Sequence, residues 1–226
     1  MGGLEMRKEQ FAWVNEQFNN TLPGVQYSDV QPGQLWDCIN LDRGQTINSS
    51  LVLFSTPMGC LDPYTNRQKT IVDTNMCTGC RLDAPESFSV KRIIFTFSKN
   101  ADPIDVVNMC EEIMWGFWLG AKRQYGGLII SLPSITRPIA PIKICEYCKA
   151  VYANQELCPG CGARHFTLTS MDEYSDEGRQ FVLELSISTV ILNQMNFRML
   201  FNGQYTFEHK FKMWVHLEGL HARGIQ

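Results

Sequence analysis

The stretch VKRIIFTFS, residues 90–98, is an apolar run of the length and composition typical of a β-strand. From residue 25 onward the chain is built of similar short apolar or alternating runs, separated by Gly, Pro, Asn and Asp. This pattern is typical of an all-β sandwich or barrel, and seven or so strands favour a sandwich. The expected strands are residues 50–56, 90–98, 114–119, 127–132, 180–187, 196–201 and 211–217.

A hairpin signal follows the sixth of these runs. Asn202 and Gly203 lie between NFRMLF and QYTFE. A two-residue type I′ turn needs positive φ at both central positions, and Asn-Gly is the pair that best adopts it. The sequence therefore predicts that the two runs form a hairpin.

One short helix interrupts the strands. Asp102 and Pro103 form a helix start signal, an N-cap residue followed by proline in the first turn. We expect this helix to cross one end of the sandwich, with Asp105 on its exposed side and Cys110 in the core. Three apolar residues are expected to share the buried face: Ile104, Val107 and Ile113.

The N-terminal segment, residues 1–24, has a different pattern. Four apolar residues follow one another at offsets of seven, three and four, which places them on one stripe of a helix. They are Leu4, Phe11, Val14 and Phe18. This helix either packs on its own domain or is an arm that docks on a neighbouring subunit, and the sequence leaves both readings open.

The sharpest motif is an array of four cysteines, two C-x2-C pairs separated by nine residues. Two residues between thiolates let one tight turn point both sulfurs at one ion, and two such turns supply the four ligands of a structural Zn²⁺ site. A thioredoxin-type motif would need a βαβ context that the surrounding sequence lacks. We expect residues 143–166 to form a zinc ribbon inserted into the sandwich, with one Zn²⁺ per chain and no catalytic role. The ligands are Cys145, Cys148, Cys158 and Cys161.

A second cysteine pair, Cys77 and Cys80, is a weaker metal candidate. It completes a site only if the fold brings Cys38 or Cys60 beside it. The alternative is a loop with buried, reduced thiols.

Composition narrows the partners of the chain. Its 226 residues carry a net charge of −3, and the basic residues are scattered, so no basic footprint for nucleic acid is present. The ribbon itself is slightly negative once four thiolates and Zn²⁺ are counted, which argues against phosphate binding. Charges near the N-terminus exclude a signal peptide there, and no apolar run reaches membrane-spanning length, so we expect a reducing cytoplasm as the site of synthesis.

Signs of catalysis are absent from the sequence. The four histidines form no HxH or HxxxH pair, and no nucleophile elbow or phosphate-binding glycine loop occurs. Aromatic residues Trp115, Phe117 and Trp118 suggest a sugar-binding platform. Neighbouring residues of a strand point to opposite faces, however, so these side chains equally suit a strand buried on both sides or at a subunit contact.

Residues 90–226 outside the ribbon resemble phage virion structural proteins of the single jelly-roll type. The resemblance lies in VKRIIFTFS, the helix after it, WGFWLGAKRQYGGLIISLP and the closing FKMWVHLEGLHARGIQ. Two phrases match the family, one in a turn and one at the C-terminus. The matching residues are Gly120, Lys122 and Tyr125 in the turn, and Val215, Leu217, Gly219, Arg223, Ile225 and Gln226 in the closing phrase.

This resemblance implies a jelly-roll sandwich made of residues 25–142 and 167–226, with the zinc ribbon in a loop that is plain in the family. It implies a non-enzymatic capsid subunit, located in the virion, whose partners are copies of itself or other virion subunits. Three alternatives remain: a glycan- or ligand-binding β-sandwich module, a zinc-ribbon nucleic-acid-binding accessory protein and a cupin-like enzyme.

Overall fold

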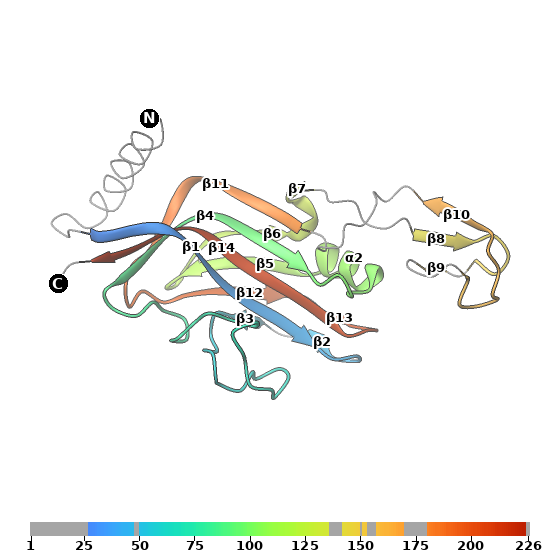
Figure 1. Cartoon of the computed structure of the whole chain (residues 1–226), viewed down its shortest axis with the longest axis horizontal. Coiled ribbons are helices and arrows are strands. Elements are labelled where there is room, and N and C mark those ends of the chain that lie inside the picture. The colour runs from blue at the N-terminus through green and yellow to red at the C-terminus, as the bar shows by residue number, and fades with distance from the viewer. Residues whose placement is uncertain are drawn as a thin grey trace.

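The computed structural model describes residues 27–47, 50–135, 142–149, 151–152, 157–169 and 180–224. The expected helix of residues 4–18, with its apolar stripe, lies outside the described residues. Within them the chain is mostly β, with antiparallel sheets that form a β-sandwich-like fold (Figure 1).

Two large sheets make up the sandwich. The first has five strands in the order β1-β14-β4-β11-β7, and the second has four in the order β3-β12-β5-β6. All pairings within them are antiparallel. The first sheet comprises β1 (Tyr27–Leu41), β14 (Phe211–Gly224), β4 (Glu86–Phe97), β11 (Gln180–Ile191) and β7 (Ser134–Ile135). The second comprises β3 (Leu51–Leu53), β12 (Phe197–Asn202), β5 (Met114–Leu119) and β6 (Lys122–Leu128).

The core lies between these two sheets. In β4 the side chains of Ile93, Phe95 and Phe97 are buried while their neighbours are more exposed, as expected for a strand with one face on the core. The Phe95 ring lies 5.0 Å from the Trp115 ring of β5 and 6.3 Å from the Phe201 ring of β12. Aromatic contacts between the sheets therefore hold the sandwich together.

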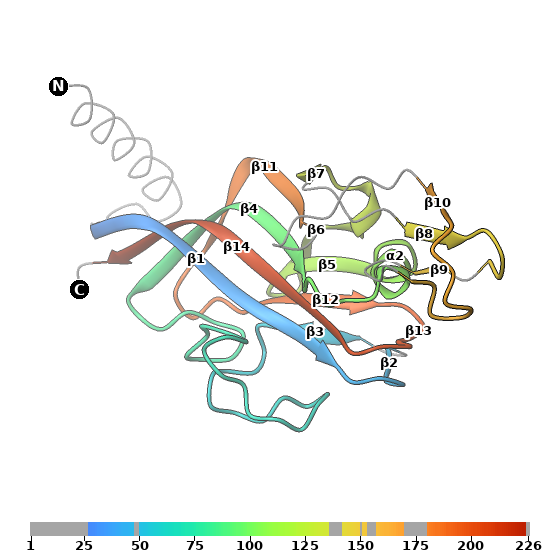
Figure 2. The same cartoon turned by 45° about the vertical axis from the view of Figure 1, so that its right-hand side comes forward.

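The ribbon and the helix lie at one end of the sandwich. The ribbon sheet has the order β10-β8-β9 and comprises β8 (Ile142–Cys145), β9 (Val151–Tyr152) and β10 (Phe166–Thr169). In Figures 1 and 2 it projects beyond α2, away from the end where β1 begins and β14 ends. Local structure in this insert is therefore separate from the sandwich sheets.

Most expected strands are confirmed, but one is wrong in part. Residues 127–132 do not form a strand of their own: β6 ends at Leu128, and Ile129–Ser131 form a 3₁₀ helix. The Ile129 side chain is buried, so this apolar run contributes to the core from a 3₁₀ helix and not from a strand. The longest strand, β1, contains no such run and was not expected.

The predicted hairpin at Asn202 and Gly203 is also wrong. β12 ends at Asn202, and the next strand, β13 (Tyr205–Thr206), pairs with β2 (Thr46–Ile47) in a separate two-stranded sheet. Neither Asn202 nor Gly203 has the positive φ of a type I′ turn. A Cβ atom at Gly203 would lie 2.8 Å from the carbonyl oxygen of Glu112, so the glycine serves a close approach to the helix end.

The helix α2 (Pro103–Glu112) begins where the cap signal places it. The Asp102 side chain accepts a hydrogen bond from the Ile104 N–H at 2.9 Å. The expected buried face is shifted, however, because Ile104 is exposed and Asp105 is fully buried. The residues that α2 and its C-cap bury are Asp105, Val106, Met109, Cys110 and Ile113.

Replacing Asp102 by alanine removes this cap. We expect the free energy of unfolding to fall by about 1 kcal/mol, the usual cost of losing an N-cap side chain. Urea denaturation measures it, and Lys99→Ala, at an exposed position just before the helix, is the control. A change no larger than that of the control would contradict a capping role.

Candidate functional site

The ribbon holds the best-defined candidate site, because two similar turns present its cysteines. Strand β8 delivers Cys145, which pairs with Phe166 of β10. The Lys149 N–H donates to the Cys145 carbonyl at 3.1 Å, and the Gly162 N–H donates to the Cys158 carbonyl at 2.8 Å. Each turn thus closes between its first cysteine and the residue after its second.

The residue that closes each turn has a left-handed backbone. Gly162 has φ +70° and Lys149 has φ +59°. Glycine adopts this conformation freely, whereas lysine adopts it at a cost of order 1 kcal/mol or more. The two turns therefore share one backbone geometry, and Lys149 adopts it in spite of the cost to a residue with a side chain.

The four sulfurs converge on one point. The Cys145 and Cys161 Sγ atoms are 3.5 Å apart, and those of Cys148 and Cys158 are 3.3 Å apart. All four lie within 4.8 Å of one another. Zn–S bonds of about 2.3 Å in a tetrahedron place sulfurs about 3.8 Å apart, so the cluster has the size of a four-thiolate metal site. The structure therefore brings together the four cysteines that the spacing predicted.

The electrostatics of the cluster also favour a cation. A backbone hydrogen bond from Cys148 chiefly, and another from Tyr147, lower the pKa of Cys145 to about 6. The Ala163 N–H lowers the pKa of Cys161, but hydrogen bonds with the neighbouring thiols raise it to about 12 overall. Four adjacent sulfurs cannot all ionise without a positive charge among them, and a divalent cation supplies one.

Cys77 and Cys80 belong to no comparable cluster. Within the described part of the chain, neither is among the groups of three or more metal-binding side chains. Cys80 instead joins two parts of the fold, since its N–H donates to the Phe54 carbonyl at 2.6 Å and its carbonyl accepts from the Phe197 N–H at 2.7 Å. Burial raises the pKa of its thiol. The geometry gives a second metal site at this pair no support.

The aromatic cluster of β5 lies largely inside the protein. Phe117 is fully buried, Trp115 is 2% exposed, and Trp118 is partly buried. Trp115 packs against Phe95 of the opposite sheet. Trp115 and Phe117 are core residues and therefore do not form a sugar-binding platform on the surface.

Sequence reasoning missed one cluster, around Asp105. This buried carboxylate accepts hydrogen bonds from the Tyr205 hydroxyl at 2.6 Å, the Glu208 N–H at 3.1 Å and the His209 N–H at 3.0 Å. Burial, and then the hydrogen bond to Asp105, raise the pKa of Tyr205 to about 12. No local signal reveals this cluster, because its members lie about a hundred residues apart in sequence.

Together with Asp102, Asp105 and His209 form the other group of metal-capable side chains among the described residues. The Nδ1 atom of His209 lies 3.3 Å from Asp105 Oδ2 and 3.7 Å from Asp102 Oδ2. Both oxygens of Asp105, however, already accept N–H or O–H donors. We therefore interpret this group as an anchor that ties the β13–β14 turn to α2.

No family model matches the chain, and no curated protein sequence matches it either. Among the described helices, none has the length and apolar character of a membrane span.

Proposed function

We propose that the chain is a non-enzymatic capsid subunit of a virion, built as a single jelly roll that carries a structural zinc ribbon. The observation that carries the proposal is the strand order. If the eight principal strands are numbered in chain order, one sheet reads 1-8-3-6, extended by the short β7, and the other reads 2-7-4-5. Two interleaved Greek keys of eight strands produce this order, which is that of jelly rolls. The eight strands are β1, β3, β4, β5, β6, β11, β12 and β14.

Jelly rolls occur in viral capsids, lectins and cupins, so the strand order alone does not distinguish these classes. The side chains between the sheets and on the surface do. A cupin-type enzyme would hold its substrate and metal in a cavity between the sheets. Here Phe95, Trp115 and Phe201 occupy that space. A lectin reading rests on the β5 aromatics, two of which are buried. A capsid subunit requires neither a substrate cavity between its sheets nor a sugar-binding aromatic surface.

Exposed apolar side chains in a long loop support subunit contacts. The loop between β3 and β4 presents Leu61 (63% exposed), Ile71 (63%) and Val72 (62%) to solvent. Large apolar side chains exposed to this extent are candidates for contacts with other proteins. We propose that this loop and the N-terminal arm contact neighbouring copies of the chain or other virion subunits.

The metal of the ribbon is proposed to be Zn²⁺. Four thiolates in a closed tetrahedral arrangement are the donor set that zinc prefers in structural sites, and they leave no open position for a substrate. Among the side chains of the insert that the structure describes, the buried cluster consists of Cys145 and Cys158 with Ala163 against it. When bound, the ion would hold these segments together. We propose that the ribbon contacts other subunits and not nucleic acid.

Electron microscopy of the purified full-length protein tests the capsid proposal. We expect closed, symmetric particles, or regular capsomers, that form as protein concentration rises. A protein that stays monomeric at high concentration, at low and at high salt, contradicts the proposal. Salt-dependent DNA binding, or fluorescence quenching by sugars in a monomer, would instead favour one of the alternatives.

Deleting residues 1–22 separates assembly from folding. We expect the truncated protein to lose nearly all particle formation while keeping the circular dichroism and melting temperature of the sandwich, because the apolar stripe is proposed to contact neighbours. Replacing Leu4, Phe11, Val14 and Phe18 by serine should have the same effect, whereas alanine at Glu5 and Glu9 is the control. Normal assembly of the truncated protein would exclude the arm.

A further inference from the structure

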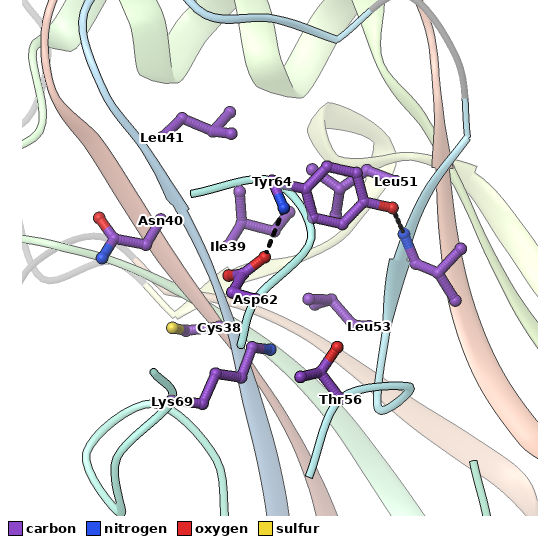
Figure 3. A pocket seen from close by; sticks show the side chains of 11 residues that line it. Cys38, Ile39, Asn40, Leu41, Leu51, Leu53, Thr56, Asp62, Tyr64 and Lys69 are labelled. Atoms are coloured by element: carbon purple, nitrogen blue, oxygen red, sulfur yellow. Dashed lines mark hydrogen bonds between the residues drawn. The ribbon is translucent and has the colours of Figure 1, made fainter. Parts of the chain in front are cut away.

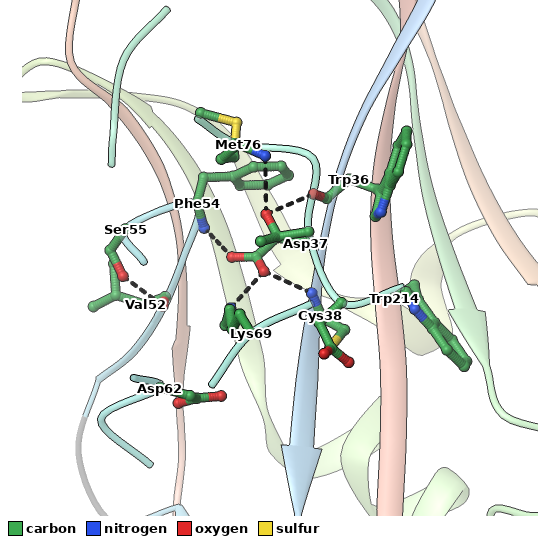
Figure 4. A network of polar contacts seen from close by, with 12 residues as sticks. Trp36, Asp37, Cys38, Val52, Phe54, Ser55, Asp62, Lys69, Met76 and Trp214 are labelled. Carbon is green, nitrogen blue, oxygen red and sulfur yellow. Dashed lines mark hydrogen bonds and ion pairs between the residues drawn. The ribbon is translucent and has the colours of Figure 1, made fainter. Parts of the chain in front are cut away.

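A buried ion pair near the edge of the sandwich belongs neither to the ribbon nor to the exposed apolar side chains of the β3–β4 loop. Asp37 of β1 lies in the inward-facing series of Leu35, Ile39 and Leu41 and is fully buried. Lys69, from the loop between β3 and β4, reaches it with an Nζ–Oδ1 distance of 2.5 Å and is itself only 5% exposed (Figure 4).

Backbone donors hold the carboxylate of Asp37 in place. The Cys38 N–H donates to Oδ1 at 2.9 Å, and the Phe54 N–H donates to Oδ2 at 2.5 Å. Phe54 has φ +65°, a rare conformation for a bulky residue, at the turn that follows β3. Strained backbone of this kind persists where the surroundings require it and is concentrated at functional sites.

The Lys69 side chain lines a pocket with both apolar and polar walls, and the pair itself is almost completely shielded from solvent. Figure 3 shows Lys69 near Cys38, Leu53 and Thr56. The polar side chains of Asn40, Asp62 and Tyr64 also line this pocket. Charges in such surroundings lose the solvation of water, which costs free energy even for a paired charge. Burial accordingly raises the pKa of Asp37, against the opposing effect of Lys69. The short contact is also a path for a proton, and its transfer from the ammonium to the carboxylate would leave a nucleophilic amine directly beside a carboxylic acid.

We propose that Lys69 and Asp37 condense to form an isopeptide bond within the folded chain. The Nζ lone pair attacks Cγ of Asp37 and forms the C–N bond, and one Cγ–O bond breaks. The departing oxygen leaves as water together with two protons that come from the ammonium group, so the ion pair becomes a neutral amide and no other reactant is needed. The Cys38 and Phe54 N–H groups face the two carboxyl oxygens and stabilise the negative charge that develops on them in the transition state.

The fixed geometry makes condensation of these two groups faster than the same reaction between separate molecules. Reactive groups held this close reach effective molarities of about 10⁵–10⁸ M, and a site closed to bulk water opposes hydrolysis of the product. The bond would tie the β3–β4 loop to the edge strand β1. It would also fix the loop that is proposed to contact neighbouring subunits, but the mass of the protein reports the bond whether or not the protein assembles, so either proposal can fail without the other.

The mass of the intact protein tests the proposal. Full-length protein is folded, then reduced, denatured and stripped of metal before mass spectrometry. We expect a mass lower by one water than the sequence predicts. A mass equal to that of the sequence overturns the proposal and leaves an ion pair.

A tryptic digest locates the bond. We expect a branched species in which residues 9–43 are joined to residues 68–81, because an acylated Lys69 resists trypsin. Lys69→Arg should restore the full sequence mass. A loss of water that persists in Lys69→Arg, or that maps to other peptides, overturns the proposal.

The chain offers a matched internal control. Lys212 lies 2.9 Å from Asp73, a similar pair whose side chains are 22% and 17% exposed. Because this pair contacts solvent, we expect trypsin to cleave normally after Lys212 in the same digest. Acylation at Lys212 as well would contradict burial as the cause of condensation.

Discussion

Replacing Cys161 by serine is expected to abolish metal binding and unfold the ribbon while the sandwich stays intact. Structural Zn²⁺ sites contribute about 10–16 kcal/mol of apparent binding free energy at neutral pH, and an insert of this size depends strongly on such a site. Elemental analysis should show one zinc per wild-type chain and almost none in the variant.

Limited trypsin digestion shows where the structure is lost. Lys149 and Arg164 lie within the ribbon and should be protected in the wild-type protein but cleaved rapidly in Cys161→Ser. Cys77→Ser, at an exposed thiol outside the ribbon, is the control and should keep its zinc. If Cys161→Ser also lost the melting transition of the sandwich, the ribbon would be part of the core. Full retention of zinc would refute the four-cysteine site.

The substitution Asp105→Asn is expected to reduce the free energy of unfolding by about 3 kcal/mol. Asp105 is fully buried and accepts three hydrogen bonds through its two oxygens. An asparagine has only one oxygen, so its NH₂ group would face at least one of the three donors, which would then lack an acceptor. A buried donor without an acceptor costs about 1–3 kcal/mol, and the loss of the charge weakens the remaining bonds. Urea denaturation monitored by circular dichroism measures the change.

Glu111→Gln is the matched control for this experiment, because Glu111 lies exposed on the same helix. We expect it to change stability by less than about 0.5 kcal/mol. Equal effects of the two substitutions would mean that Asp105 does not anchor the β13–β14 turn.

The metal site was predictable because each half of it is local. Two residues between cysteines define a turn without reference to the rest of the fold, and the structure places all four sulfurs together. Strand β5 was predictable for a similar reason, since MWGFWL is a continuous apolar run whose middle residues, Trp115–Phe117, are buried.

Strand β1 was not predictable from its own residues. It contains Pro32, Gly33 and Asp37, which ordinarily argue against a strand. Pro32 is tolerated because β1 is at the edge of its sheet, and Asp37 because Lys69 and two backbone donors satisfy it. Both explanations require the neighbours that only the folded chain supplies.

The hairpin and Asp105 failed as predictions for the same physical reason. Gly203 and Asp105 both face partners from distant parts of the chain, the end of α2 in one case and the β13–β14 turn in the other. Turn chemistry and helical periodicity take account only of residues that are close together in the sequence. Tertiary contacts overrode them at both places.

The position of β14 has a consequence for synthesis of the protein. This strand lies between β1 and β4, pairing with both along most of its length. While a ribosome is still producing residues 211–224, the two flanking strands have already emerged but have nothing to join them. The five-stranded layer therefore closes only after these residues have been translated, and until then β1 and β4 each keep an unpaired edge.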